Sequence, residues 1–262
     1  MNQILDGARI IICLIFLVYA SWSDYKSREV SDKVWALFGP LALLLTGVQI
    51  LFFSSQPFQM VTFYVLSFAI TSGLAVAIFY FGGFGGADAK ALMCIALALP
   101  VYPGNLLSHY VGFVSPLFPI TIFSNGVLLG ALSVFFAIFR NLLWITQNKE
   151  GLFEGMKAEP VVRKILVLVS GYKIKLSKLE NSHMFPLEDF EINEDGEKSP
   201  KLLVFPDYDE REDIINRLKE NKPNGWMWAT PGLPLLIFIT VGLIVALAFG
   251  DIIWLVLGSF LF

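Results

Sequence analysis

The chain has 262 residues, of which 56% are hydrophobic and only 16% carry a charge. This composition is too apolar for a soluble domain of this length, so it excludes the soluble classes of protein and gives no reason to expect a nucleic-acid partner. The net charge of −3 is uninformative, because the charged residues are clustered along the chain.

Several apolar runs are long enough to cross a bilayer, which takes about 20 residues as a helix. We expect helices at residues 4–23, 34–53 and 60–81, and a shorter one from near Asp88 to Pro100 or Pro103. A fifth follows at 120–145, and the last begins after Pro234. Near the start of the first helix, Asp6 and Arg9 lie three residues apart on one face and are predicted to pair.

The composition changes between residues 146 and 228, which hold 13 of the 19 Lys and Arg residues and 16 of the 22 Asp and Glu residues. We predict a water-soluble insert, with a two-stranded hairpin at 163–176 and a helix at 207–220. Residues 194–198 are expected to form an exposed turn, and Trp226, Trp228 and Trp254 to lie at the membrane interface.

The expected fold is therefore an all-α polytopic membrane protein of about six transmembrane helices with a small cytoplasmic α+β insert. Its predicted parts are a membrane domain at 1–145, the insert at 146–228 and a C-terminal membrane span at 229–262. Lys26, Arg28 and Lys33 lie in the short connection after the first helix, which favours a cytoplasmic position for that connection. The N-terminus is then outside the cell membrane and the insert inside.

This topology predicts that two aspartates meet. Asp24 ends the first span at the cytoplasmic face, two spans leave and return, and Asp88 begins the fourth span at the same face. Two close carboxyl groups do not both ionise easily, so they share a proton. One then serves as general base toward water and the other as general acid toward a peptide carbonyl. The alternatives are a helix N-cap for Asp88 and an interfacial charge for Asp24.

Other residues around the aspartates have weaker roles in this prediction. Gly85 and Gly86 end a run of four glycines within residues 82–86, which permits close backbone approach of an extended peptide. Glu29 and Asp32 either attract a basic peptide or form a solvated loop. Lys90 either pairs with Asp88 or marks the inner membrane interface. The sequence has no His-Glu-x-x-His and no Gly-x-Ser-x-Gly motif, and we expect neither a metal site nor a cofactor.

These motifs carry a family resemblance. Gly85-Gly86-Ala87-Asp88 resembles the Gly-x-hydrophobic-Asp signature of GxGD aspartic membrane proteases, and the segment from Asp24 to Val30 resembles the first-aspartate motif of prepilin peptidases. Residues 228–234 are similar to the segment before the last helix in archaeal members. The chain thus resembles archaeal type IV prepilin or preflagellin (prearchaellin) peptidases over nearly its whole length. It lacks the two Cys-x-x-Cys pairs usual in bacterial members, so methyltransferase activity is not carried over.

The resemblance implies that Asp24 and Asp88 form a catalytic pair of an aspartic endopeptidase. It implies that the substrate is a pilin-like or archaellin precursor with a class III signal peptide, whose short basic leader is removed at the cytoplasmic face of the cell membrane. Two rivals remain. A signal-peptide-peptidase-like intramembrane protease would cut within a span, and a transporter or channel would use intramembrane aspartates along an ion pathway.

Overall fold

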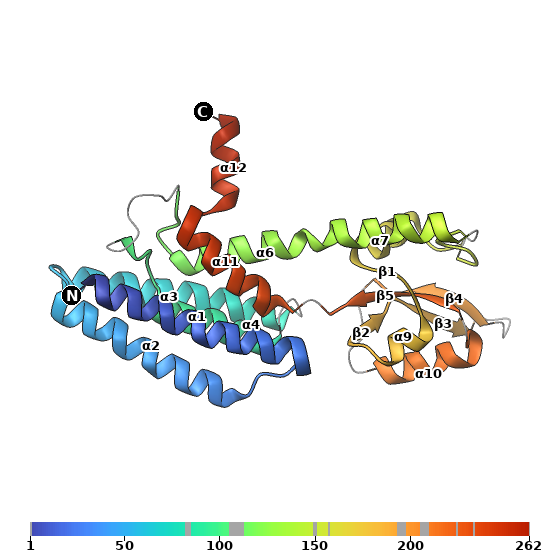
Figure 1. Cartoon of the computed structure of the whole chain (residues 1–262), viewed down its shortest axis with the longest axis horizontal. Coiled ribbons are helices and arrows are strands. Elements are labelled where there is room, and N and C mark those ends of the chain that lie inside the picture. Colours follow the sequence, from blue (N-terminus) through green and yellow to red (C-terminus); the bar gives the residue numbers. More distant parts are fainter. Residues whose placement is uncertain are drawn as a thin grey trace. The chain divides into compact units, whose positions relative to one another are not determined.

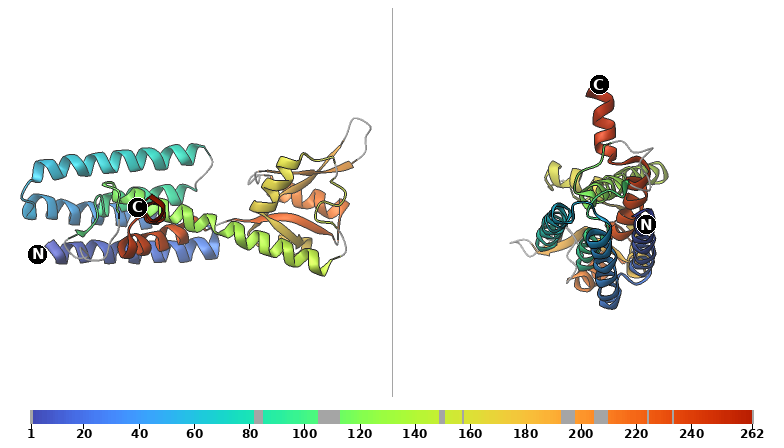
Figure 2. Two further views of the ribbon diagram at one scale, coloured as in Figure 1. Left: turned by 90° about the horizontal axis from the view of Figure 1, so that it is seen from above. Right: turned by 90° about the vertical axis from the view of Figure 1, so that its left-hand side faces the viewer.

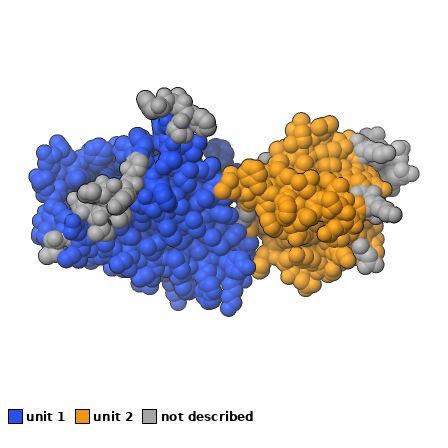
Figure 3. Space-filling view, turned by 45° about the horizontal axis from the view of Figure 1, so that its top comes forward, with its two compact units in different colours: residues 1–130, 234–262 blue, residues 131–233 orange. Residues whose placement is uncertain are grey.

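The structure is a computed structural model that describes residues 2–81, 85–104, 113–148, 151–156, 158–192, 198–204, 210–223, 225–232 and 234–261. The chain divides into two compact units (Figures 1 and 3). Unit 1 comprises residues 1–130 and 234–262, and unit 2 comprises residues 131–233. Each unit has its own hydrophobic core.

Unit 1 is built from helices, of which α1, α2 and α3 run alongside one another (Figure 2). Their starts follow from local sequence: the Ser31 hydroxyl accepts a hydrogen bond from the Lys33 N–H ahead of α2, and Pro57 occupies the first turn of α3. The described helices of this unit are α1 (Asn2–Ser27), α2 (Asp32–Phe53), α3 (Pro57–Tyr80), α4 (Gly86–Ala98), α6 (Phe118–Ala131), α11 (Leu235–Phe249) and α12 (Ile252–Leu261).

Within the described residues, four helices are long and apolar enough to cross a membrane: Asn2–Ser27, Asp32–Phe53, Pro57–Tyr80 and Phe118–Gln147. The pair α11 and α12 makes a fifth if it counts as one span, with a bend of 47° at the break that contains Asp251. Large apolar side chains are exposed along these helices, as expected for surfaces that face lipid. The chain is therefore a polytopic, mostly helical membrane protein.

Helix α4 is the centre of unit 1, although it is too short to count among these spans. Its 13 residues cover about 20 Å. Leu92, Ile95 and Leu99 are completely buried, and the helix packs against α1, α2, α3 and α11. The sequence analysis expected this helix to be short, because Pro100 and Pro103 follow it.

The C-terminal end of α4 lies inside the unit, where its last carbonyl groups need hydrogen-bond partners. Three surrounding helices supply them. Arg9 of α1 donates to the Ala98 carbonyl oxygen at 3.1 Å, and Thr46 of α2 donates to the Leu97 and Ala98 carbonyl oxygens at 2.9 and 3.1 Å. Ser67 of α3 donates to the Pro100 carbonyl oxygen at 2.8 Å. These bonds fix the depth of α4 and so the place of its other end.

Unit 2 combines short helices with two antiparallel sheets. One sheet has the strand order β1-β5-β2, in which Tyr172 lies opposite Ala229, and the other pairs β3 with β4. The described elements are α7 (Ser133–Gln147), α8 (Val161–Ser170), β1 (Tyr172–Lys175), α9 (Leu176–Glu180), β2 (Met184–Pro186), β3 (Glu188–Ile192), β4 (Lys198–Leu202), α10 (Arg211–Asn221) and β5 (Trp226–Pro231).

A buried carboxylate ties this unit together. Glu188 has no exposed surface, and its carboxylate accepts hydrogen bonds from Lys173 at 3.4 Å, from Lys222 at 3.1 Å and from the Trp228 backbone N–H at 3.1 Å. The four residues come from four different parts of the unit. A buried charge that has lost its partners is strongly destabilising, so this cluster stabilises the contact of β3 with β1 and β5 of the other sheet.

Two expectations about the insert are wrong. The hairpin at 163–176 is not formed: Val161–Ser170 is helix α8, and only the residues after Gly171 form a strand, which pairs with the distant β5. A side chain at Gly171 would lie 2.7 Å from the Ala229 carbonyl oxygen, so only glycine fits this transition. Trp228, expected at the membrane interface, is completely buried and stacks on Phe153 at 4.9 Å.

The predicted helix at 207–220 is present as α10, over Arg211–Asn221. Most of the predicted turn at 194–198 lies outside the described residues. The predicted pair of Asp6 and Arg9 is confirmed, and Arg9 is turned inward instead of toward the membrane surface.

Candidate active site

Asp24 lies in the last turn of α1 and is half-buried. The sequence ends the helix directly after it, because Ser27 donates its hydroxyl to the Ser23 carbonyl oxygen at 2.9 Å and so competes for that acceptor. Arg28 then adopts a left-handed backbone with φ of 59°, and its N–H donates to the Asp24 carbonyl oxygen at 2.9 Å. The aspartate therefore stands at a sharply defined helix end.

Asp88 lies in the first turn of α4 and is also half-buried. Its Oδ2 accepts a hydrogen bond from the Gly85 N–H at 3.0 Å, which is one half of a capping box. Gly85 itself is extended, with φ of −73° and ψ of 157°. The capping role considered for Asp88 is thus present, and it holds the carboxylate in a defined orientation without preventing proton transfer.

The two aspartates lie at the same end of unit 1. Helices α1 and α4 pack against each other, and Arg9 near the start of α1 reaches the end of α4, so the end of α1 with Asp24 lies toward the start of α4 with Asp88. The charge of Asp24 has a small effect on the carboxyl group of Asp88, after burial and the Gly85 hydrogen bond. The two residues are 64 positions apart in the sequence. That they act as a pair stays a prediction.

Arg28 is a charged neighbour to which the sequence analysis gave no role beyond topology. Its guanidinium charge acts on Asp24, which it follows by one helical turn. Among the described residues its Nε is buried without a hydrogen-bond partner. A left-handed residue at a helix end is usually Gly or Asn, so the arginine at this position did not allow the turn to be predicted from the sequence.

Of the two alternatives for Lys90, the pair with Asp88 is not formed, and the position at the inner membrane interface stays a prediction. Nζ of Lys90 lies 2.5 Å from Oδ1 of Asp32, in place of a contact with Asp88. Both side chains are largely exposed, so the pair is solvated, and it links the start of α2 to the start of α4. Glu29 is also exposed, and its carbonyl oxygen accepts hydrogen bonds from the hydroxyl groups of Ser23 and Ser27 at 2.8 and 3.2 Å. Glu29 and Asp32 therefore lie near the end of α1 that carries Asp24.

The two glycines before Asp88 differ in their surroundings. A methyl group on Gly85 would lie 3.2 Å from Oδ2 of Asp88, whereas one on Gly86 would lie 3.8 Å from the ring of Phe79, its one neighbour within 4 Å among the described residues. The first distance requires the carboxylate to shift, and the second is an ordinary contact. Residues 82–84, the first part of the glycine run, lie outside the described residues.

Within the described ranges, no group of three or more His, Cys, Asp or Glu side chains is arranged to hold a metal ion. His109, one of the two histidines of the chain, falls outside those ranges. The expectation that the chain uses no metal and no cofactor therefore stays a prediction.

Comparisons with known proteins cover almost the whole chain. Residues 11–146 match the model of the type IV leader peptidase family, and residues 163–252 match that of the archaeal peptidase A24 C-terminus, type II. A preflagellin peptidase of Methanococcus voltae is 29% identical over 245 residues, which is 92% of this chain and 94% of the relative. Preflagellin peptidases of Methanococcus maripaludis and Methanocaldococcus jannaschii are each 26% identical, over 92% of this chain and 94% and 93% of the relatives.

Proposed function

Because the chain belongs to the type IV leader peptidase family, we propose that it removes the leader peptide from preflagellins or similar pilin-like precursors, and that Asp24 and Asp88 activate the attacking water. The observation that supports the proposed site is the packing of α1 against α4, which puts two half-buried carboxyl groups at one end of unit 1, one at the end of α1 and one at the start of α4. The family match covers both residues.

The proposed reaction is a hydrolysis with general acid–base catalysis. The ionised carboxylate takes a proton from water while the oxygen of that water attacks the scissile carbonyl carbon. The protonated carboxyl group donates its proton to the carbonyl oxygen. Collapse of the tetrahedral intermediate then breaks the C–N bond, and the leaving amine takes up a proton. The two roles belong to the pair and are not divided between Asp24 and Asp88.

We propose that the substrate reaches this pair as an extended strand along Gly85 and Gly86. An extended peptide needs close backbone approach, which glycines allow. Glu29 and Asp32 are exposed acids near the same end of the unit and suit a basic leader. The Lys90 charge on Asp32 opposes that attraction, so Lys90 tunes how strongly a basic leader is held.

The site is proposed to lie at the cytoplasmic face of the cell membrane, with the N-terminus outside and the insert at 146–228 in the cytoplasm. Support comes from three basic residues at the junction of α1 and α2, because basic residues in and beside short loops favour the cytoplasmic side: Lys26 in the last turn of α1, Arg28 in the connection and Lys33 in the first turn of α2. No metal or cofactor is invoked. The bilayer around the apolar helices and the precursor are the proposed partners.

The experiment that tests this function is identification of the cleavage position. The purified full-length protein, reconstituted in lipid vesicles, is incubated with a preflagellin, and the products are identified by mass spectrometry. We expect one cut, after the basic leader and before the apolar helix. A cut inside the apolar helix would support a signal-peptide-peptidase-like protease instead. The absence of any cut by a folded protein would contradict the proposal.

A further inference from the structure

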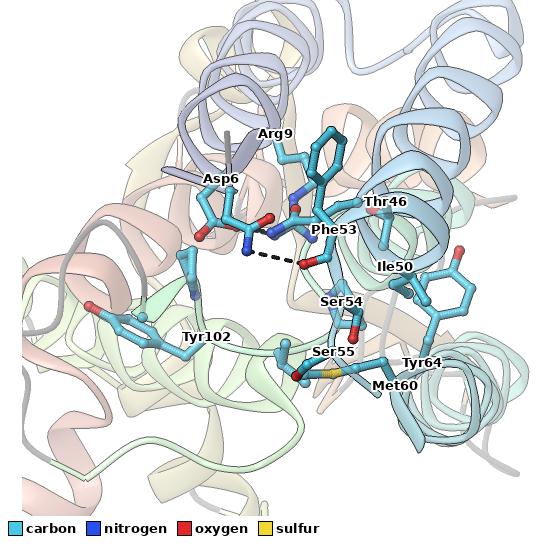
Figure 4. Close-up of a pocket in the computed structure, with 16 residues that line it drawn as sticks. Asp6, Arg9, Thr46, Ile50, Phe53, Ser54, Ser55, Met60, Tyr64 and Tyr102 are labelled. Carbon is cyan, nitrogen blue, oxygen red and sulfur yellow. Dashed lines mark hydrogen bonds and ion pairs between the residues drawn. The ribbon is translucent and has the colours of Figure 1, made fainter. Parts of the chain in front are cut away.

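A polar pocket lies at the opposite end of unit 1 from the two aspartates. It has a volume of about 380 Å³, which is in the size range of small-molecule sites. Figure 4 shows that α1, α2, α3 and the segment after α4 all contribute to its wall. Asp6, on this wall, and Asp24 are separated by 18 residues of α1, or about 27 Å. The pocket is therefore separate from the proposed active site.

The wall contains a buried ion pair. Asp6 and Arg9 are 1% and 4% exposed, and Nη2 of Arg9 donates to Oδ1 of Asp6. Gln49 donates to the same oxygen at 2.9 Å, and the second terminal nitrogen of Arg9 holds the Ala98 carbonyl oxygen of α4. The charges of Asp6 and Arg9 therefore compensate each other, while Oδ2 of Asp6 and Nε of Arg9 are left without a hydrogen-bond partner among the described residues.

Several polar atoms of the wall have no partner. Within the described part of the chain, the buried atoms on lining residues that make no hydrogen bond are Asn2 Oδ1, Asp6 Oδ2, Arg9 Nε, Gln49 Oε1 and the Tyr64 hydroxyl. An unsatisfied buried polar group costs about 1–3 kcal/mol, so this concentration around one cavity indicates that something else satisfies them. Three of these atoms accept hydrogen bonds only, one donates only, and the hydroxyl does both.

We propose that this pocket binds a neutral, hydroxyl-rich group such as a sugar or a glycerol moiety. A hydroxyl group both donates and accepts, so one kind of ligand group can serve the three acceptors and Arg9 Nε. These atoms are buried, so the lining side chains rotate to present them to the ligand. A phosphate is disfavoured because the carboxylate of Asp6 already compensates Arg9, the one charged donor among the described lining residues. A metal cation is disfavoured because Arg9 compensates Asp6, the one carboxylate among those same residues.

The surroundings of the pocket favour the headgroup of a membrane glycolipid as the source of this group. The pocket is lined by the end of α2 and the connection to α3, where Phe52 and Phe58 are 74% and 84% exposed. Exposed aromatic side chains beside a polar site at the ends of apolar helices suit a ligand with a polar head and an apolar chain. Because Arg9 also holds the end of α4, an occupied pocket would stiffen the helix that carries Asp88.

The test uses the full-length protein in phosphatidylcholine nanodiscs, with and without a small fraction of monogalactosyl diacylglycerol, and native mass spectrometry to detect bound lipid. The headgroup of phosphatidylcholine has no hydrogen-bond donor, so this lipid serves as the reference. Gln49→Leu removes one unsatisfied acceptor, and Ile50→Phe fills the pocket. Leu51→Phe is the matched control, because Leu51 is exposed and does not line the pocket.

We expect the galactolipid to remain bound to the unmodified protein and to Leu51→Phe, to bind about tenfold more weakly to Gln49→Leu, and not to bind to Ile50→Phe. The same pattern with free methyl galactoside, and none with the lipid, would support the pocket chemistry with a soluble ligand. Absence of binding to the unmodified protein, or equal binding by all four proteins, would overturn the proposal and leave a pocket that holds only water. The comparison of the two lipids on the unmodified protein needs no variant to fold.

Discussion

Replacement of Gly85 by alanine is the change for which the structure makes the sharpest statement about the site. The new methyl group would lie 3.2 Å from Oδ2 of Asp88, so the carboxylate must move by a few tenths of an ångström. Its hydrogen bond from the Gly85 N–H, now 3.0 Å, would weaken with that movement. Hydrogen bonds to charged groups contribute about 1.5–3 kcal/mol.

If about half of that contribution is lost from the orientation of Asp88 in the transition state, the chemical step slows about four- to tenfold, since about 1.4 kcal/mol corresponds to a factor of ten. The backbone of Gly85 is extended and accessible to alanine, so the loss of protein stability should be below about 1 kcal/mol. The expected change is therefore a lower kcat, in addition to any rise in KM from the loss of close approach by the peptide. A role of Gly85 only in peptide approach would raise KM and leave kcat unchanged.

Gly86→Ala separates the two roles of the glycines, because among the described residues its methyl group would meet the Phe79 ring at 3.8 Å and not the carboxylate of Asp88. Alanine is the better helix former, so this variant should be at least as stable as the original and keep kcat within about twofold, while the loss of close approach by the extended peptide raises KM. The assay is cleavage of a preflagellin by each protein in lipid vesicles, with kcat and KM measured separately. An equal loss of kcat in both variants, or an unchanged kcat in Gly85→Ala, would refute the reasoning.

Three further predictions concern neighbouring charges and the insert. Arg28→Gly should have unchanged or slightly higher stability, because glycine adopts φ of 59° without strain, but it should cleave about tenfold more slowly, because Asp24 loses a compensating charge. Unchanged cleavage would show that the guanidinium has no part in the site. Asp32→Asn should raise the KM for a basic leader about two- to threefold, and Lys90→Met should lower this KM by a similar factor, as expected for an exposed pair. A lower KM for Asp32→Asn or a higher KM for Lys90→Met in steady-state kinetics would contradict this electrostatic role. Glu188→Gln should destabilise unit 2 by about 3 kcal/mol, because it removes the charge that binds two lysines, and this loss should be measured as faster hydrogen exchange in β1 and β5. Unchanged exchange would mean that the cluster does not stabilise the sheet.

The position of both aspartates at one end of the helical unit was predictable from the sequence because it depends only on counting apolar runs. Asp24 ends one run and Asp88 begins another after two crossings, so both come to one end of the helical unit whatever the packing details. The Asp6–Arg9 pair was predictable because residues three apart face the same side of a helix. These inferences need only the helical repeat and the length of a span.

The partners of individual side chains were less predictable, because they depend on which helix ends lie side by side. Lys90 was expected at Asp88 or at the interface, but the start of α2 places Asp32 closer. The segment at 163–170 was expected as a strand because a short run rich in valine and leucine suits both structures. It forms α8, and the strand begins only where Gly171 lets the chain pass close to β5.

The pocket at Asp6 also escaped the sequence analysis. Asn2, Gln49 and Tyr64 come from three helices and show no common spacing, so nothing in the sequence indicates that their polar atoms face one cavity. Only the Asp6–Arg9 pair was visible beforehand, and it was interpreted as a feature of the outer helix end.

The central claim is that Asp24 and Asp88 act as one catalytic pair. Its most direct test is the rate of preflagellin cleavage by Asp24→Asn, by Asp88→Asn and by the double variant, with Asp213→Asn as a control for the same chemical change at an exposed acid of unit 2. Asparagine keeps the size of the side chain but neither takes nor gives the proton that the mechanism requires. We predict that each single variant falls to the background rate, that the double variant is no slower, and that the control keeps full activity. Cleavage near the original rate by either single variant, in a protein that still inserts into the membrane, would contradict the claim.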